Sequence, residues 1–162
     1  MMKMRRSERE VTDAAKIDAI IRRCECVRLG FVDGDEAYIV PVNFALTEED
    51  GKRVFYIHGA QEGRKAALVR EKGRCSFEMD CSHEVLHAEQ ACDYSYYYQS
   101  VMGKGSIAFV DDLAKKAAAL NLIMGQYSGK SNWNFPDIML QRTGVLRLEV
   151  TDLSAKEHMA KK

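Results

Sequence analysis

The sequence predicts a mainly β protein: a closed or partly closed antiparallel β-barrel with helices packed outside it. Two observations predict this class. The apolar residues fall into short runs rich in β-branched and aromatic residues, and turn sequences such as DGDE and EEDGK join the early runs as hairpins. Few helical segments separate the runs, so few crossover connections of the kind that parallel strands need are available.

The chain has 162 residues, a length that suits one domain with its own hydrophobic core. We find no internal repeat and no linker between domains. We therefore expect a single domain over residues 1–162, with mobile ends at residues 1–11 and 152–162.

The first expected element is an amphipathic helix. Thr12 or Asp13 can cap its N-terminus, because their side-chain oxygens accept hydrogen bonds from the first turn. Apolar side chains then recur at the helical spacing i, i+3, i+4 and i+7, on Ile17, Ile20, Ile21 and Cys24. The pattern indicates a surface helix with one buried stripe.

Two strands, CVRLGFV and AYIVPVNFAL, follow as a hairpin. Pro41 lies inside the second strand and has no N–H to donate to a neighbouring strand. We therefore expect a sheet edge or a bulge there, with the backbone groups of Val42 and Asn43 left free for a ligand.

The strand RVFYIH leads through a glycine-containing junction into a helix that extends to about Arg70, with Gly73 as its C-terminal cap. RCSFEMD is the next strand, and residues 81–95 resist assignment. The strand-like segment YYYQSVMGKGSIAFV is interrupted by Gly103 and Gly105, where we expect a bulge or bend.

The last expected elements are a helix, a loop and a strand. Asp111 and Asp112 begin the helix LAKKAAALNLIMGQY. Residues 128–142 form a loop with a short helical turn after Pro136, and GVLRLEV alternates as the final strand. The expected order is helix, three strands, helix, two strands, helix, strand.

Charge and cysteine content narrow the possible partners and the location. Lys plus Arg and Asp plus Glu both total 24, so no overall positive field draws the chain to nucleic acid or to an anionic membrane. No apolar run has the length of a membrane span or of a secretory signal core. Five cysteines, an odd number, indicate reduced thiols and a cytoplasmic location.

The junction in FYIHGAQEGRKAAL has the features of an anion site. A helix N-terminus presents unpaired N–H groups, and glycines allow an anion to approach the backbone. Arg64 and Lys65 could balance the charge of a phosphate monoester. The spacing of Gly59 and Gly63 excludes a nucleotide P-loop. The alternative is an ordinary strand-to-helix loop with exposed cations.

YIHGAQEGRK, with PVNF upstream and YYQSVMGKG downstream, resembles the flavin-binding split-barrel proteins related to pyridoxamine 5'-phosphate oxidase, especially the nitroimidazole-reductase branch. The similarity covers most of the chain. It implies a six-stranded antiparallel split barrel of the FMN-binding type, a homodimer, and FMN in a cleft between the subunits. Related split barrels accept haem or a deazaflavin in place of FMN.

The resemblance also implies the site residues. The backbone of Val42 and Asn43 would face the isoalloxazine ring, and Ile57 and His58 would lie along the flavin, with His58 as the first catalytic candidate. The other implied positions are Arg64 and Lys65 at the phosphate, Ser100 and Val101 on the next strand, and Trp133 as a cover from the partner subunit.

HEVLH at residues 83–87 matches a zinc-metalloprotease pattern, in which two histidines one helical turn apart bind the metal. A zinc hydrolase also needs a third ligand at a suitable spacing, and Cys81, Glu89 and Cys92 do not stand at the usual one. We expect no metal site here, but a polar loop or a short exposed helix.

The expected function is an FMN-binding oxidoreductase, with NAD(P)H-dependent reduction of a small aromatic or nitro-type acceptor. The flavin supplies the chemistry, and the protein positions it. Two alternatives stay open: a non-catalytic flavin-binding sensor or storage module, and a zinc hydrolase that uses HEVLH. The same pocket serves an enzyme and a sensor, so sequence does not separate them.

Overall fold

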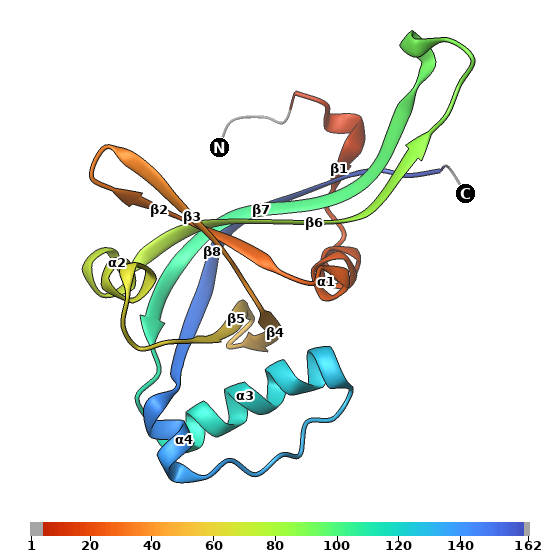
Figure 1. The fold of residues 1–162 in the computed structure, drawn as a ribbon. Helices are drawn as coiled ribbons and strands as arrows, with labels where there is room; N and C mark the ends of the chain where they lie inside the picture. Colours follow the sequence, from red (N-terminus) through yellow and green to blue (C-terminus); the bar gives the residue numbers. More distant parts are fainter. Residues whose placement is uncertain (1–4, 161–162) are drawn as a thin grey trace.

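The computed structural model describes residues 5–160 and contains one antiparallel sheet with helices around it (Figure 1). The sheet order is β3-β2-β6-β7-β8-β5-β4, and the short β1 pairs with β8. The strands are β1 (Glu10–Val11), β2 (Val27–Asp33), β3 (Glu36–Val42), β4 (Phe44–Glu49), β5 (Lys52–Gly59), β6 (Arg74–Leu86), β7 (Ser95–Phe109) and β8 (Gly144–His158). The predicted mainly β, antiparallel class is confirmed.

The helices lie outside the sheet, with α3 and α4 together below it in Figure 1. They are α1 (Ala14–Arg23), α2 (Arg64–Lys72), α3 (Leu113–Ser128) and α4 (Asp137–Arg142), and short 3₁₀ turns cover Ser7–Arg9 and Ala91–Asp93. Within residues 5–160, no helix is long and apolar enough to cross a membrane.

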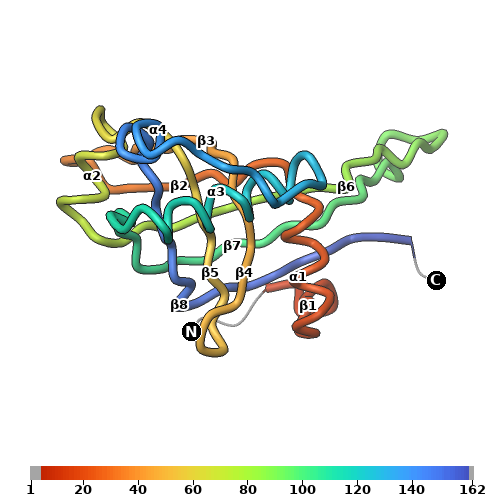
Figure 2. The backbone as a smooth tube through the Cα atoms, turned by 90° about the horizontal axis from the view of Figure 1, so that it is seen from below, coloured from red at the N-terminus to blue at the C-terminus, as the bar shows by residue number. Residues whose placement is uncertain are grey.

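The connection between β3 and β4 at Asn43 shows that the sheet closes into a split barrel. Strands β3 and β4 stand at opposite ends of the sheet path, yet only Asn43 separates them in the chain. The sheet must therefore bend back on itself until β3 meets β4, two strands that Figure 2 labels. The expected six strands are all present: Asn43 divides one of them into β3 and β4, and β1 is a short addition.

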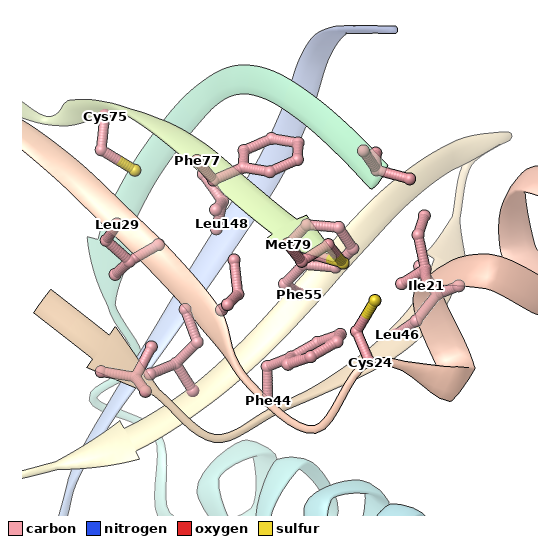
Figure 3. Close-up of a cluster of buried hydrophobic side chains, with 14 of the residues drawn as sticks. Ile21, Cys24, Leu29, Phe44, Leu46, Phe55, Cys75, Phe77, Met79 and Leu148 are labelled. Carbon is pink, nitrogen blue, oxygen red and sulfur yellow. The ribbon is translucent and has the colours of Figure 1, made fainter. Parts of the chain in front are cut away.

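The barrel interior is filled by apolar side chains from both halves of the chain. Phe44, Phe55 and Phe77 pack edge to face, with ring centroids 5.4 and 5.1 Å apart. Met79 and Leu148 are fully buried beside them, as Figure 3 shows. The aromatic cluster joins β4, β5 and β6, so these strands enclose one core.

Local signals set the element ends as expected. The Asp13 carboxylate accepts a hydrogen bond from Lys16 N at 2.7 Å and begins α1, and the Asp112 carboxylate does the same for α3 through Lys115 N at 2.8 Å. Gly73 ends α2 with a φ of 59°, which few other residues adopt. The capping predictions are confirmed.

The two glycines of β7 lie where other strands approach closely. The pairing of β7 with β8 shifts register between Lys104 and Gly105, which confirms the predicted bulge. A Cβ on Gly103 would lie 2.5 Å from both Asp152 O and the Phe77 ring, and a Cβ on Gly105 would overlap Glu149 O. Both positions require the absence of a side chain.

The expectation of mobile ends is wrong for the terminal residues that lie in β1 and β8. Residues 152–158 are not a mobile tail, because β8 extends to His158 and pairs there with Tyr98 of β7. At the other end, Glu10 and Val11 pair with β8. Residues 1–4 and 161–162, which also belong to the predicted mobile ends, lie outside the described residues.

Residues 81–95 also have regular structure. Strand β6 continues to Leu86 and β7 begins at Ser95, so together they form a long hairpin arm, at the upper right of Figure 1. A register shift between Cys81 and Glu84 bends the arm. The polar residues of HEVLH hide this strand from the alternation pattern on which strand prediction depends.

Candidate functional site

The predicted anion site lies where β5 passes into α2. Gly63 precedes the helix with a φ of 99°, a conformation that a residue with a Cβ rarely adopts. Among the residues that the structure describes, no side chain caps the first turn of α2, so its N–H groups are available to a ligand. The junction therefore offers the positive end of a helix dipole at an open position.

Lys65 points back from the first turn of α2 onto the end of β5. A Cβ on Gly59 would lie 2.7 Å from the Lys65 Nζ atom, so the glycine makes room for the ammonium group. Burial lowers the pKa of Lys65 below its ordinary value. Within residues 5–160, no carboxylate lies within ion-pair distance of Lys65, so its charge is available to an external anion.

Arg64 is less free than the sequence suggested. Its guanidinium forms an ion pair with Asp33 at the end of β2 and lies over the ring of Tyr38, 4.9 Å from the centroid. The pairing links α2 to the β2–β3 hairpin. An incoming phosphate would have to compete with Asp33 for Arg64, whereas no carboxylate of the described residues 5–160 competes for Lys65.

His58 lies beside this charge, at the end of β5. It pairs with Val145 of β8, and its side chain reaches solvent. Partial burial lowers the pKa of His58, and the positive charge of Lys65 lowers it further. The imidazole is therefore neutral at neutral pH and can accept a proton.

Replacing Lys65 by methionine should raise the pKa of His58 towards its ordinary value of 6.5, but not to it, because the burial remains. The unfolded chain binds this proton more readily than the folded chain, so the free energy of unfolding falls as the pH drops below about 6.5. The fall should be smaller in the variant. An NMR titration of the His58 ring protons measures the shift, with Lys72→Met at the other end of α2 as the control.

Further polar contacts join the junction and α3 to the segment just before β8. The Gln61 side chain donates to the carbonyl oxygens of Gln141 and Thr143, the latter at 3.3 Å. Lys116, which is buried, donates to Leu140 O and Thr143 O, both at 3.0 Å. These contacts hold the start of β8 against the junction. Sequence analysis missed Gln61 and Lys116, because nothing in the chain separates them from surface residues.

The predicted ring-binding residues lie around the barrel seam, the break at Asn43 between β3 and β4, where Ile57 pairs with Phe44 on one side and with Leu146 on the other. The side chains of Val42 and Ile57 point into the core. Asn43 is exposed, and its amide donates to Glu25 O at 3.3 Å. Tyr127, which sequence analysis did not single out, accepts from Phe44 N at 3.1 Å and donates to Glu25 O at 2.7 Å. These hydrogen bonds link Asn43 and Phe44 to Glu25, so side chains hold the two sides of the seam together.

The remaining predicted residues do not gather at this junction within one chain. Ser100 pairs with Asp80 and Lys156, and the Val101 side chain is buried in the core. Trp133 is 39% exposed in the loop before α4. Its backbone N–H donates to Asn121 Oδ1, and the Lys130 Nζ atom lies 4.0 Å from the centroid of its ring. None of the contacts described for residues 5–160 joins Ser100 or Trp133 to His58.

HEVLH lies on the hairpin arm and not on a helix. The His83 Nε2 atom lies 2.8 Å from the Asp80 Oδ2 atom, and the His83 ring stacks on Tyr96. His87 packs edge to face on Tyr94. Positions i and i+4 are far apart on an extended strand, so the two imidazoles cannot share a zinc ion as they do on a helix. Within residues 5–160, no three metal-binding side chains cluster. The expectation of a loop or short helix was wrong, and the zinc-hydrolase alternative loses its geometric basis.

Solved structures of similar fold include several flavin proteins. A protein from Bacteroides thetaiotaomicron described as a 5-nitroimidazole antibiotic resistance protein is 26% identical, with a TM-score of 0.79 over 91% of this chain and 86% of that one. A flavocytochrome from Azotobacter vinelandii is 19% identical, with a TM-score of 0.79 over 98% and 73%. An FAD- and haem-binding protein from Mycobacterium smegmatis is 15% identical, with a TM-score of 0.79 over 94% and 74%.

At their low sequence identities, the flavocytochrome and the FAD- and haem-binding protein show only that this chain shares their fold. No curated protein matches this chain. The family model described as pyridoxamine 5'-phosphate oxidase matches residues 13–157, nearly the whole described chain. The predicted resemblance is therefore confirmed: this chain belongs to the pyridoxamine 5'-phosphate oxidase family of flavin-binding split barrels.

Proposed function

We propose that the protein binds FMN, with the phosphate at the N-terminus of α2, and that it is an oxidoreductase. The observation that supports this best is the Lys65 ammonium group, which lies over Gly59 beside the N-terminus of α2 and has no ion-pair partner among residues 5–160. A phosphate there would meet one free cation, a second cation shared with Asp33, and backbone N–H groups.

The proposed reaction takes reducing equivalents from NAD(P)H and passes them to a small aromatic or nitro-type acceptor. Bound FMN would supply the redox chemistry. The backbone at Val42 and Asn43 would position the ring, and the neutral His58 could accept or return a proton at the end of β5. A cytoplasmic location fits the five cysteines, which are all free thiols.

We also propose that two copies of the chain complete the site. Ser100 lines an open cleft of about 440 Å³ on β7 and β8, far from the strand partners of His58. Met102, in the same cleft, is 58% exposed. A partner subunit that covers this face would bury Met102, and it would bring its own residues to the flavin. Ser100, Val101 and Trp133 stay predictions that depend on this dimer.

A visible absorption spectrum tests the proposal directly. The purified protein is mixed with FMN, desalted, and compared with a sample that received riboflavin, which lacks the phosphate. Retention of about one FMN per chain, with little riboflavin, supports the phosphate site. Equal loss of both flavins contradicts it. Stopped-flow mixing of the loaded protein with NADH or NADPH then shows whether the flavin is reduced; retention without reduction would indicate a binding module.

His58→Ala should retain FMN but lose turnover by about 10²-fold or more, the usual contribution of a positioned acid or base. His58→Gln serves as the matched variant, since its amide preserves a hydrogen bond but not proton transfer. Steady-state rates and flavin content are measured on the same samples. Full activity in both variants would leave His58 only a structural role.

A further inference from the structure

Two cysteines far apart in the sequence meet at the end of α1. Cys24 is the C-terminal cap residue of α1, and Cys81 lies on β6, just before the bend of the hairpin arm. Both are buried, with 1% and 9% of their surfaces exposed. Their sulfur atoms lie 3.3 and 3.9 Å from the same carbonyl oxygen, Ile20 O. The two thiols are therefore close neighbours.

The surroundings shift the pKa values of the two thiols in opposite directions. A hydrogen bond with the Cys24 thiol lowers the pKa of Cys81; burial opposes this, and the Ser82 hydroxyl and the Arg23 charge support it. The Ser82 Oγ atom lies 3.6 Å from the Cys81 sulfur. The pKa of Cys24 is raised by its contact with Cys81 and by burial. One partner is thus suited to be a thiolate and the other a thiol.

We propose that Cys24 and Cys81 are a peroxide-sensitive dithiol that closes a disulfide between α1 and β6. The proposal is independent of the flavin site. It accounts for a feature that the flavin function does not use: two buried thiols that lie near the same carbonyl oxygen, Ile20 O, with the Ser82 hydroxyl next to the Cys81 sulfur.

The chemistry needs hydrogen peroxide as the oxidant. The Cys81 thiolate attacks one peroxide oxygen, the O–O bond breaks, and the departing hydroxide takes up a proton to become water. Cys81 is then a sulfenic acid. The Cys24 sulfur attacks the Cys81 sulfur, the S–O bond breaks, and a second water leaves with the Cys24 proton. Two thiols are oxidised, and one peroxide is reduced to two waters.

The disulfide would constrain a large part of the barrel. The loop that it closes runs from residue 24 to residue 81 and contains β2 to β5 and α2. Cys24 also precedes Glu25, whose carbonyl oxygen accepts hydrogen bonds from Asn43 and Tyr127 at the seam. Oxidation would thus fix the segment to which Asn43 and Tyr127 are hydrogen-bonded at the seam. A cross-link of this kind stabilises mainly by restricting the unfolded chain.

The experiment treats the reduced protein with a small excess of hydrogen peroxide, blocks the remaining thiols after denaturation, and maps the peptides by mass spectrometry. We expect free thiols to fall from five to three per chain, with Cys24 joined to Cys81. The midpoint of thermal unfolding should rise by several degrees. Five persisting thiols, or a cross-link between other cysteines, would overturn the proposal.

Variants separate the two roles. Cys24→Ser should leave Cys81 as a sulfenic acid that dimedone traps, and Cys81→Ser should slow peroxide consumption by at least about tenfold. The control is Cys92→Ser, an exposed position on the hairpin arm, which should still lose two thiols. Peptide mapping of the peroxide-treated protein without substitutions decides the proposal, even if a variant at a buried cysteine folds poorly. Loss of the disulfide in Cys92→Ser would contradict the assignment.

Discussion

Replacing Lys65 by alanine is expected to weaken FMN binding by about 10- to 100-fold, the usual size of one charge-assisted hydrogen bond to a phosphate. The effect is large because Arg64 is already paired with Asp33, whereas Lys65 forms no ion pair with any residue in the described range 5–160. Titration of flavin fluorescence against protein concentration measures the dissociation constant. Circular dichroism should show an unchanged fold, because the lysine side chain fills no part of the core.

Lys72→Ala is the matched control for this experiment. Lys72 lies on the same helix but at its C-terminal end, where it pairs with Glu71 at 2.7 Å. The Lys72→Ala substitution removes one positive charge, as Lys65→Ala does, but leaves the junction unchanged. The FMN affinity should therefore change less than about twofold. If Lys65→Ala binds FMN as tightly as Lys72→Ala does, the phosphate is held elsewhere.

Gly105→Ala is expected to lower the free energy of unfolding by about 3 kcal/mol, a large effect for one methyl group. The added Cβ would overlap the Glu149 carbonyl oxygen and crowd Leu148 Cδ1 at 2.8 Å. Backbone cannot move aside as a flexible side chain can, so β7 and β8 must separate at the bulge. Denaturant unfolding followed by fluorescence gives the difference.

Gly30→Ala is the comparison variant, since Gly30 also lies in a strand of the barrel. The nearest atom to its added Cβ is Ser76 O at 3.9 Å, an ordinary contact distance. This variant should lose less than about 1 kcal/mol. Similar losses in both variants would show that strand glycines matter here for another reason than close approach.

Elements whose signals are local were predictable from the sequence. Asp13, Gly73 and Asp112 act within one helical turn, so their capping roles can be inferred without knowledge of the rest of the chain. The expected edge at Pro41 also follows from a property of proline alone, and β3 is indeed a terminal strand of the sheet. In both cases the physical cause lies within a few residues.

Contacts between distant residues were not predictable. The ion pair of Arg64 with Asp33 joins residues 31 positions apart, and it changes which cation is available to a phosphate. The hairpin arm depends on pairing between Glu84 and Tyr97, and its polar residues carry no clear alternation. The Cys24 and Cys81 pair likewise appears only after α1 and β6 pack together.

The position of β8 has a consequence for how the chain folds as it is synthesised. This strand lies between β7 and β5 and also pairs with β1, although it follows all of them in the chain. Strands β5 and β7 therefore keep one edge exposed until the ribosome has released residues 144–158. Until then the growing chain carries unpaired strand edges that favour aggregation, so its yield in cells should depend on chaperones that bind such edges.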